Sequence, residues 1–479
     1  MLRSMRAGCA CFFLATGWVS AAQDWSEEHL TVAAALQERA LAGTAAYEHV
    51  SALVTQVGPR FAGSAGDDVA VRWALNRLGE LGFSKVRTQD VLAPRWVRGE
   101  ARVEIVGPGA QPLVAVALGG SVGTSEAGVE APVVEVESLE ALSALTPTEV
   151  SGKIVFINRR MERTRDGSGY GAAVSIRTQG PSAAGGLGAA ALVIRSVGTS
   201  DERVAHTGAL VYRIDAPRIP AFAISNPDAD LLSRQIARQS GQHGASGKPV
   251  RLRLHSTARE LPSTWSANVI GEIPGGERPE EIVLLGAHLD SWDVGPGALD
   301  DAAGVAIVME AARLISKLER APARTIRVVL FANEEFGLSG AREYAKLPQE
   351  EIDRHIIALE ADFGQGPVWR VQSQVAAEAL PAIAAIHQVL QPMTIELGGN
   401  DASGGADIGP LRELGVPVLD LTHDGTHYFD VHHTLNDTLA KVDAKALDQS
   451  VAAYAVAAYL AASKRGDFGR LTATTSASQ

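Results

Sequence analysis

Residues 281–290 read EIVLLGAHLD, an apolar run that ends in a histidine and an aspartate. Such a short, nearly continuous apolar run is typical of a strand buried on both faces of a parallel sheet. Comparable runs follow at 325–332, 356–360 and 416–421, and the intervening stretch 304–318 has the apolar spacing of a helix. This alternation predicts an α/β domain whose mainly parallel or mixed sheet has helices on both faces.

The chain of 479 residues is longer than one ordinary core requires, so further structural parts are expected around this domain. Residues 22–101 have amphipathic helical spacing and are expected to form an N-terminal helical part of the same domain. Residues 102–260 alternate short β-like runs with Gly, Ser and Pro turns, including a polar, loop-like stretch at 239–249. This texture predicts an inserted, mostly-β module, followed by the main catalytic domain at 261–466 and a disordered tail at 467–479.

A short basic segment, an apolar stretch at 7–18 and small residues at 19–22 predict a secretory signal peptide over residues 1–21 or 1–22. The apolar stretch is too short for a membrane span. Both cysteines, Cys9 and Cys11, lie in this segment. We therefore expect a secreted or periplasmic protein without disulfides and, after cleavage, without a membrane partner.

The composition excludes several classes of protein. Hydrophobic residues make up 46% of the chain and charged residues 20%, a balance that argues against a disordered or fibrous protein. The net charge is −12 and no basic block offsets it, which argues against nucleic acid as a partner.

Every predicted strand of the α/β domain ends near a side chain that can bind a metal ion. Because the carboxyl ends of parallel strands meet at one edge of a sheet, these side chains are expected to lie close together. Without a cation, so many carboxylates at one place would repel each other and raise their pKa values. In chain order the residues are His288, Asp290, Asp300, Glu334, Glu335, Asp362, His432 and His433.

Imidazoles and carboxylates without a thiolate are typical ligands of catalytic zinc. A carboxylate that can bridge favours two zinc ions, which would polarise a carbonyl group and activate water. A further carboxylate must then accept a proton from the water and deliver it to the leaving group. The adjacent Glu334 and Glu335 fit this division, one facing the metal and one facing the water.

Several motifs together resemble the M28 family of co-catalytic zinc peptidases. They are VGPR at 57–60, HLDSWDVG at 288–295, Asp300-Asp301 and FANEEFGLSG at 331–340. The stretch around 152–158 resembles the protease-associated domain that is common in this family. The resemblance implies a zinc exopeptidase fold, two zinc ions, a peptide substrate with a free terminus such as a dipeptide, and a homodimer.

The resemblance also implies the ligands of each zinc ion. His288 and Asp362 would hold one ion, and Glu335 with a late histidine would hold the other. Asp300 would bridge both ions, and members of the family often have a cis peptide after this residue.

The remaining catalytic roles follow from the same comparison of motifs. Asp290 would orient His288, and Glu334 would act as the general base and then as the acid. The late histidine is expected four residues before Asp437, which makes His433 the ligand and His432 a helper that stabilises the oxyanion; the reverse assignment stays open.

Residues 403–407 read SGGAD and are expected to start a helix. Free N–H groups at Ser403 and Gly404 would then receive a substrate carboxylate, with ordinary capping by Ser403 or Asp407 as the alternative. His423 and His427 either line the cleft or belong to a loop.

Four other functions are alternatives to an exopeptidase of short peptides. An aminopeptidase of broader specificity stays open. An M20 amidohydrolase would carry a lid domain between Asp362 and the late histidine, where this chain has only a short segment. A glutaminyl cyclase would hold one zinc ion, and a receptor-like binding protein would lack some of the ligands, whereas the ligand set here is complete.

Overall fold

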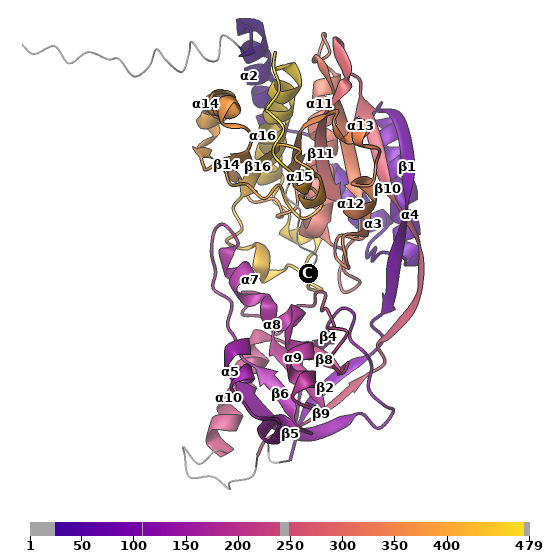
Figure 1. Ribbon diagram of the computed structural model, residues 1–479, viewed down its shortest axis with the longest axis vertical. Coiled ribbons are helices and arrows are strands. Elements are labelled where there is room, and N and C mark those ends of the chain that lie inside the picture. The colour runs from indigo at the N-terminus through magenta and orange to yellow at the C-terminus, as the bar shows by residue number, and fades with distance from the viewer. Residues whose placement is uncertain (1–23, 108, 240–248, 474–479) are drawn as a thin grey trace, which may run out of the picture.

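The computed structural model describes residues 24–107, 109–239 and 249–473. Within these ranges the strands form two eight-stranded sheets, one above the other in Figure 1. The predicted signal peptide at 1–21 and most of the polar stretch at 239–249 lie outside the described residues. Among the described residues, no helix is both long and apolar enough to cross a membrane.

The first sheet is mixed and has the strand order β1-β10-β12-β11-β13-β16-β14-β15. Its centre is parallel, since β11 pairs in parallel with β12 and β13, and β13 pairs in parallel with β16. The outer strands β10 and β14 are antiparallel to their inner neighbours. The strands are β1 (Ser84–Val97), β10 (Arg259–Ile273), β11 (Arg278–His288), β12 (Arg324–Phe331), β13 (His355–Glu360), β14 (Val368–Gln374), β15 (Glu396–Leu397) and β16 (Val418–His423).

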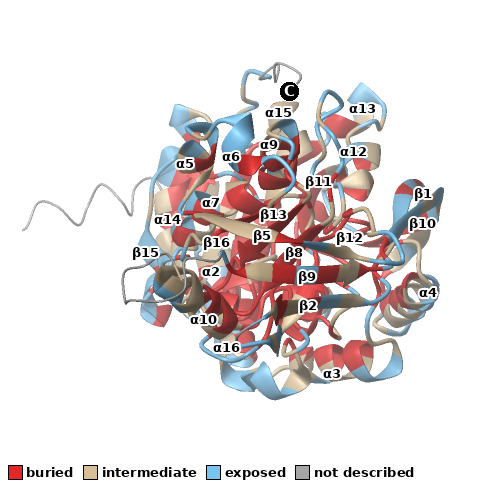
Figure 2. Cartoon of the chain, turned by 90° about the horizontal axis from the view of Figure 1, so that it is seen from below, coloured by how far each residue is buried: buried red, intermediate tan, exposed pale blue. Residues whose placement is uncertain are grey.

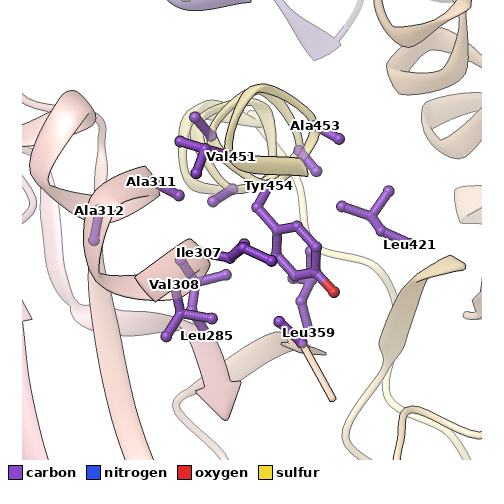
Figure 3. Close-up of a cluster of buried hydrophobic side chains, with 14 of the residues drawn as sticks. Leu285, Ile307, Val308, Ala311, Ala312, Leu359, Leu421, Val451, Ala453 and Tyr454 are labelled. Atoms are coloured by element: carbon purple, nitrogen blue, oxygen red, sulfur yellow. The ribbon is translucent and has the colours of Figure 1, made fainter. Parts of the chain in front are cut away.

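Helices cover both faces of this sheet, which confirms the predicted α/β architecture. Because side chains alternate along a strand, Leu285 of β11 packs in the core under the long helices, whereas Leu284 packs on the opposite face. Figure 3 shows Leu285 and Leu359 of the sheet meeting Ile307 and Tyr454 of the covering helices. One face carries α2 (Glu27–Leu41), α3 (Ala46–Gln56), α11 (Ala303–Ser316), α14 (Leu380–Leu390) and α16 (Ala444–Ser463), and the other carries α12 (Ser339–Tyr344), α13 (Gln349–Ile352) and α15 (Gly409–Glu413).

The segment at 22–101, expected to be helical, also contains a long strand. After α2, α3 and α4 (Ala65–Glu80), β1 runs antiparallel to β10 at the edge of the sheet. Its side chains are mostly exposed or half-buried, so it lacks the apolar run by which the inner strands were found. Figure 1 shows both strands extending from the first sheet toward the second.

Residues 101–256 form the second sheet and its helices, called here the second-sheet module. The strand order is β3-β2-β9-β5-β6-β7-β8-β4. The expectation of a mostly-β module was wrong in one respect, because β5 to β8 pair in parallel and the connections between them contain helices. Figure 2 shows buried strands of this sheet with helices around them. The elements are β2 (Ala101–Val106), β3 (Gln111–Leu113), β4 (Ala115–Ala117), β5 (Val129–Val136), α5 (Leu139–Ser143), α6 (Pro147–Val150), β6 (Ile154–Ile157), α7 (Ser168–Ala173), α8 (Ser175–Thr178), α9 (Gly180–Gly186), β7 (Ala191–Arg195), β8 (Ala221–Ile224), α10 (Asn226–Ala237) and β9 (Arg251–Ser256).

The end of the chain is packed further than expected. A disordered tail was predicted from residue 467, but Phe468 is fully buried in the main core. Its carbonyl accepts a hydrogen bond from the Ala376 amide at 3.0 Å, and the Leu471 amide donates to Gly415 at 3.0 Å. Burial of the Phe468 ring contributes roughly 1.5–3 kcal/mol, and the two backbone hydrogen bonds add to the attachment of this segment.

Candidate metal centre

The ends of β11 and β13 bring the first predicted group together. His288 is the last residue of β11, and Asp362 follows β13 by two residues. The Nε2 atom of His288 lies 3.4 Å from Oδ1 of Asp362 and 3.2 Å from Oδ1 of Asp300. All three side chains therefore face one small volume at the edge of the sheet.

The second predicted group lies on the other side of Asp300. The Nε2 atom of His433 lies 2.9 Å from Oε2 of Glu335 and 3.3 Å from Oδ2 of Asp300. Asp300 thus presents one carboxylate oxygen to His288 and the other to His433. Side chains that could share a metal ion occur here in overlapping sets, namely Asp300 with His432 and His433, His288 with Asp301 and Asp362, and His288 with Asp300 and Glu335.

The loop that carries Asp300 is held by hydrogen bonds to its backbone. The two carboxylate oxygens of Asp437 accept the amides of Leu299 at 2.7 Å and Asp300 at 3.1 Å. The peptide bond between Asp300 and Asp301 is cis. The carboxylate of Asp301 accepts the amides of His288 and Gly304, so its two oxygens already serve the backbone.

The two late histidines lie face to face with a distance of 3.5 Å between ring centroids. His433 uses its Nδ1 atom toward the carbonyl of Thr207 at 3.3 Å, which leaves Nε2 directed at the carboxylates. The Nε2 atom of His432 lies 3.7 Å from Asp300, and its buried Nδ1 atom has no hydrogen-bond partner among the described residues. This geometry favours His433 over His432 as a metal ligand.

The electrostatics of the cluster favour a bound cation. Burial and then neighbouring carboxylates such as Asp362 and Asp300 raise the pKa values of Glu334 and Glu335 well above their usual range. Burial lowers the pKa of His288, but the adjacent acids Asp362 and Asp300 raise it well above its usual value. A bound dication would relieve this repulsion.

Two buried oxygens of the cluster also have no hydrogen-bond partner within the described part of the chain. They are Oε1 of Glu335 and Oδ2 of Asp290. Imidazole nitrogens and carboxylate oxygens without any thiolate are a donor set that fits catalytic zinc. The residues present therefore fit the predicted metal.

Asp290 contacts both of its predicted neighbours. Its carbonyl oxygen lies 3.1 Å from Nδ1 of His288, and its carboxylate accepts the Glu334 amide at 3.0 Å. The backbone of Asp290, more than its carboxylate at 3.7 Å, faces the ring of His288. Asp290 thereby connects the end of β11 with the loop that carries both glutamates.

The segment at 403–407 does not start a helix. The helix α15 begins at Gly409, and Ser403 and Gly404 lie in a loop. The half-buried carboxyl of Asp420 lies near their amides, which lower its pKa against the opposing effect of burial. Two successive glycines with positive φ, Gly404 at 86° and Gly405 at 95°, explain why the chain turns here instead of coiling.

Glu360, the last residue of β13, was missed by the sequence analysis. Its carboxylate accepts the amides of Asp407 at 3.1 Å and Ile408 at 2.9 Å, a few residues after the amides of Ser403 and Gly404 that were expected to receive a substrate carboxylate. A Cβ atom on Gly405 would lie 2.2 Å from Oε2 of Glu360, so only glycine allows this approach. In the sequence, the Gly404-Gly405 pair is the feature that indicates such a close approach.

Asp407 lies behind this loop and is fully buried. Neither of its carboxylate oxygens has a hydrogen-bond partner among the described residues. Burial, with the nearby charges of Glu360 and Glu334, raises its pKa well above the usual range.

A cavity of about 240 Å³ opens beside the cluster. Asp362 and Glu360 form its inner end, and Asp166 of the second-sheet module lies on its wall. His423 lines this cavity, whereas His427 is exposed and lies 3.0 Å from Asp430 of its own loop. The two histidines left open by the sequence therefore have different surroundings.

Comparison with known proteins agrees with this geometry. Residues 268–458 match peptidase family M28. Carboxypeptidase Q of Rattus norvegicus is 36% identical over 416 residues, which cover 87% of this chain and 85% of the relative. A peptidase M28 precursor from Shewanella amazonensis, solved by crystallography, has a TM-score of 0.90 at 45% identity and covers 93% of this chain and 99% of its own. A zinc aminopeptidase from Bacillus subtilis shares the fold, with a TM-score of 0.62 at 21% identity over 90% of this chain and 98% of its own.

Proposed function

Because this chain belongs to peptidase family M28, we propose that this metallopeptidase is a secreted dizinc exopeptidase of short peptides and dipeptides. The observation that carries the proposal is the position of Asp300. Its two carboxylate oxygens face His288 on one side and His433 on the other, at 3.2 and 3.3 Å. A carboxylate between two separate sets of donors is the arrangement that a bridged pair of metal ions needs.

We assign His288 and Asp362 to one zinc ion, Glu335 and His433 to the other, and Asp300 to both. When bound, the two ions supply Lewis-acid chemistry, since they polarise the scissile carbonyl group and lower the pKa of a water molecule. The protein fixes the ligands from behind: Asp437 holds the loop of Asp300, and the carbonyl of Thr207 faces Nδ1 of His433.

Glu334 is the proton carrier in this proposal. Its amide is fixed by the Asp290 carboxylate, and its own carboxyl is buried beside the proposed zinc ligand Glu335, where it can gain and lose a proton. Its carboxylate accepts a proton from the attacking water and then donates it to the nitrogen of the leaving amine. His432, whose Nδ1 atom has no hydrogen-bond partner among the described residues, would stabilise the oxyanion.

The cavity beside Asp362 supports a short substrate. At about 240 Å³ it is smaller than most ligand sites, and Asp166 of the second-sheet module lies on its wall. The name of the relatives, carboxypeptidase Q, favours recognition of a free carboxyl end. An aminopeptidase of broader specificity is the alternative. The two activities differ in which terminus of the substrate peptide must be free.

The test is hydrolysis of four groups of substrates: free dipeptides, N-blocked peptides, C-amidated peptides and peptides blocked at both ends. We expect cleavage only where a terminus is free, loss of activity on chelation, and recovery with zinc. Loss with C-amidated peptides alone indicates a carboxypeptidase, loss with N-blocked peptides alone indicates an aminopeptidase, and loss with both indicates a dipeptidase.

Two variants make this experiment specific. Glu334→Gln should lower kcat by roughly a thousandfold while it keeps the bound zinc. Glu378→Gln, at an exposed residue remote from the cluster, is the matched control and should behave as the wild type. Cleavage of doubly blocked peptides would contradict the exopeptidase, and a fully active Glu334→Gln variant would contradict the general base.

A further inference from the structure

Two consecutive residues of the second-sheet module, His206 and Thr207, hold the backbone around His433. The Nδ1 atom of His206 lies 2.8 Å from the carbonyl oxygen of His432, to which it donates. The amide of Thr207 donates to the carbonyl of His433 at 3.0 Å, and the carbonyl of Thr207 faces Nδ1 of His433 at 3.3 Å. Three polar contacts thus join His206 and Thr207 to the late histidines.

The backbone of His433, which these contacts hold, is strained. His433 has a φ of 60°, in the left-handed region that a side chain with a Cβ atom rarely adopts. Such a conformation persists only where the surrounding structure determines it from several sides. Here the carbonyl before this residue and the carbonyl of the residue itself are both held by the second-sheet module.

His206 and Thr207 are themselves held in place by contacts within the second-sheet module. The amide of His206 donates to Oγ of Ser196 at 2.9 Å, and Ser196 in turn donates to the carbonyl of Ile224 at the end of β8. The ring of His206 is buried and lies flat against Gly198, where an added Cβ atom would lie 2.2 Å from Cε1. Thr207 accepts a hydrogen bond from Arg98 at 2.8 Å. The contact therefore extends from the second sheet to the metal cluster.

We propose that His206 and Thr207 are positioning residues for the zinc ligand His433, so that the second-sheet module is a structural part of the metal centre. The proposal rests on the dizinc site proposed above. It implies that one of the two ions, the one assigned to Glu335 and His433, depends on the second-sheet module, while the ion of His288 and Asp362 does not.

The test is zinc affinity in full-length protein with three substitutions. His206→Phe removes the donor but keeps a ring of similar size, whereas His206→Asn keeps a donor near the position of Nδ1. His255→Phe, in β9 of the same module, is the matched control, because His255 is half-buried and lies away from the cluster. Two measurements are made: zinc dissociation constants by titration against a chelator of known affinity, and the visible spectrum of the cobalt-loaded protein.

We expect His206→Phe to weaken one of two zinc sites by about tenfold and to change the cobalt spectrum of that site alone. His206→Asn and His255→Phe should bind both ions as the wild type does. Two unchanged sites in a folded His206→Phe variant would overturn the proposal, and so would equal weakening of both sites. A wild-type protein that binds fewer than two zinc ions would instead contradict the proposed function.

A second variant keeps the test decisive where His206→Phe does not fold. Gly198→Ala leaves every atom of His206 and Thr207 in the protein but places a methyl group against the His206 ring. Its backbone has no positive φ, so alanine is compatible with it. We expect the same selective loss at one zinc site, and unchanged affinity in this folded variant would overturn the proposal.

Discussion

The Oε2 atom of Glu335 lies 2.9 Å from the Nε2 atom of His433. The two residues come from loops after different strands, β12 and β16, and meet only because those strands end at the same edge of the sheet. Both side chains are buried, so bulk water solvates neither of them. A carboxylate and an imidazole nitrogen held in this way are placed as two ligands of one ion.

This contact predicts that substitutions of His433 and of His432 have different effects. His433→Ala should bind about one zinc ion per chain and lose hydrolytic activity, because it removes a ligand. His432→Ala should keep two zinc ions and lower kcat by about 100–1,000-fold, as expected for loss of an oxyanion donor. Metal analysis of the purified variants, beside steady-state kinetics, checks both statements. The opposite pattern of zinc content would assign the ligand to His432.

A second prediction concerns the loop that carries Asp300. Asp437→Asn replaces one acceptor oxygen by an NH₂ group, so the amide of either Leu299 or Asp300 loses its partner. An unpaired buried amide costs about 1–3 kcal/mol of stability. We expect a lower unfolding midpoint of the metal-free protein and weaker binding of both zinc ions, since Asp300 faces both sites. Normal affinity at one site would contradict a bridging Asp300.

The residues at the strand ends could be predicted because of two simple regularities. Buried parallel strands are apolar runs, and their carboxyl ends meet at one edge, so the sequence predicts His288 and Asp362 at one edge, where their side chains lie 3.4 Å apart. The edge strand β1 carries no comparable run, because one of its sides faces solvent. Its position became visible only through its pairing with β10.

Contacts between distant segments could not be predicted in this way. The carboxylate of Glu360 faces the loop before α15, although its own strand reads as ordinary apolar sequence. The bonds from His206 and Thr207 to the late histidines depend on how the two sheets pack against each other. Local spacing carries no information about such packing, so nothing in the sequence around His206 indicates a contact with His432.

Asp407 yields a prediction about stability and activity together. Its two buried oxygens have no partner among the described residues, and it lies near the acids Glu360 and Glu334. Burial forces this acid either to carry an unfavourable charge or to take up a proton, and Asp407→Asn removes that cost, so the metal-free protein should become more stable at pH 7, by about 1 kcal/mol. A carboxyl group near Glu334 favours Glu334 as a base, so its loss should lower kcat. Thermal unfolding and kcat are measured on one preparation, and a simultaneous rise in both would contradict this account.

Glu310 lies far from the metal cluster and makes stability depend on pH. It is fully buried in α11, where Arg313 donates to it at 2.6 and 2.7 Å and the Ala45 amide at 3.1 Å. Nε2 of His49 lies 3.4 Å away. Burial raises the pKa of this carboxyl, but the hydrogen bonds from Arg313 and Ala45, together with the nearby His49 ring, outweigh it and lower the pKa to about 2.

The sign of the effect follows from where the proton binds. The unfolded chain takes up the proton near the usual pKa of 4.5, and the folded protein takes it up only near pH 2. The stabilisation is therefore complete above about pH 4.5 and is lost as the pH falls toward 2. Glu310→Gln should lower the unfolding free energy at pH 7 by roughly 2–3 kcal/mol and remove this part of the acid dependence. Urea unfolding of the chelated protein at several pH values checks the prediction, with the exposed Glu378→Gln as control. Curves for Glu310→Gln and the wild type that stay parallel between pH 4.5 and 2 would show that the ion pair does not have this role.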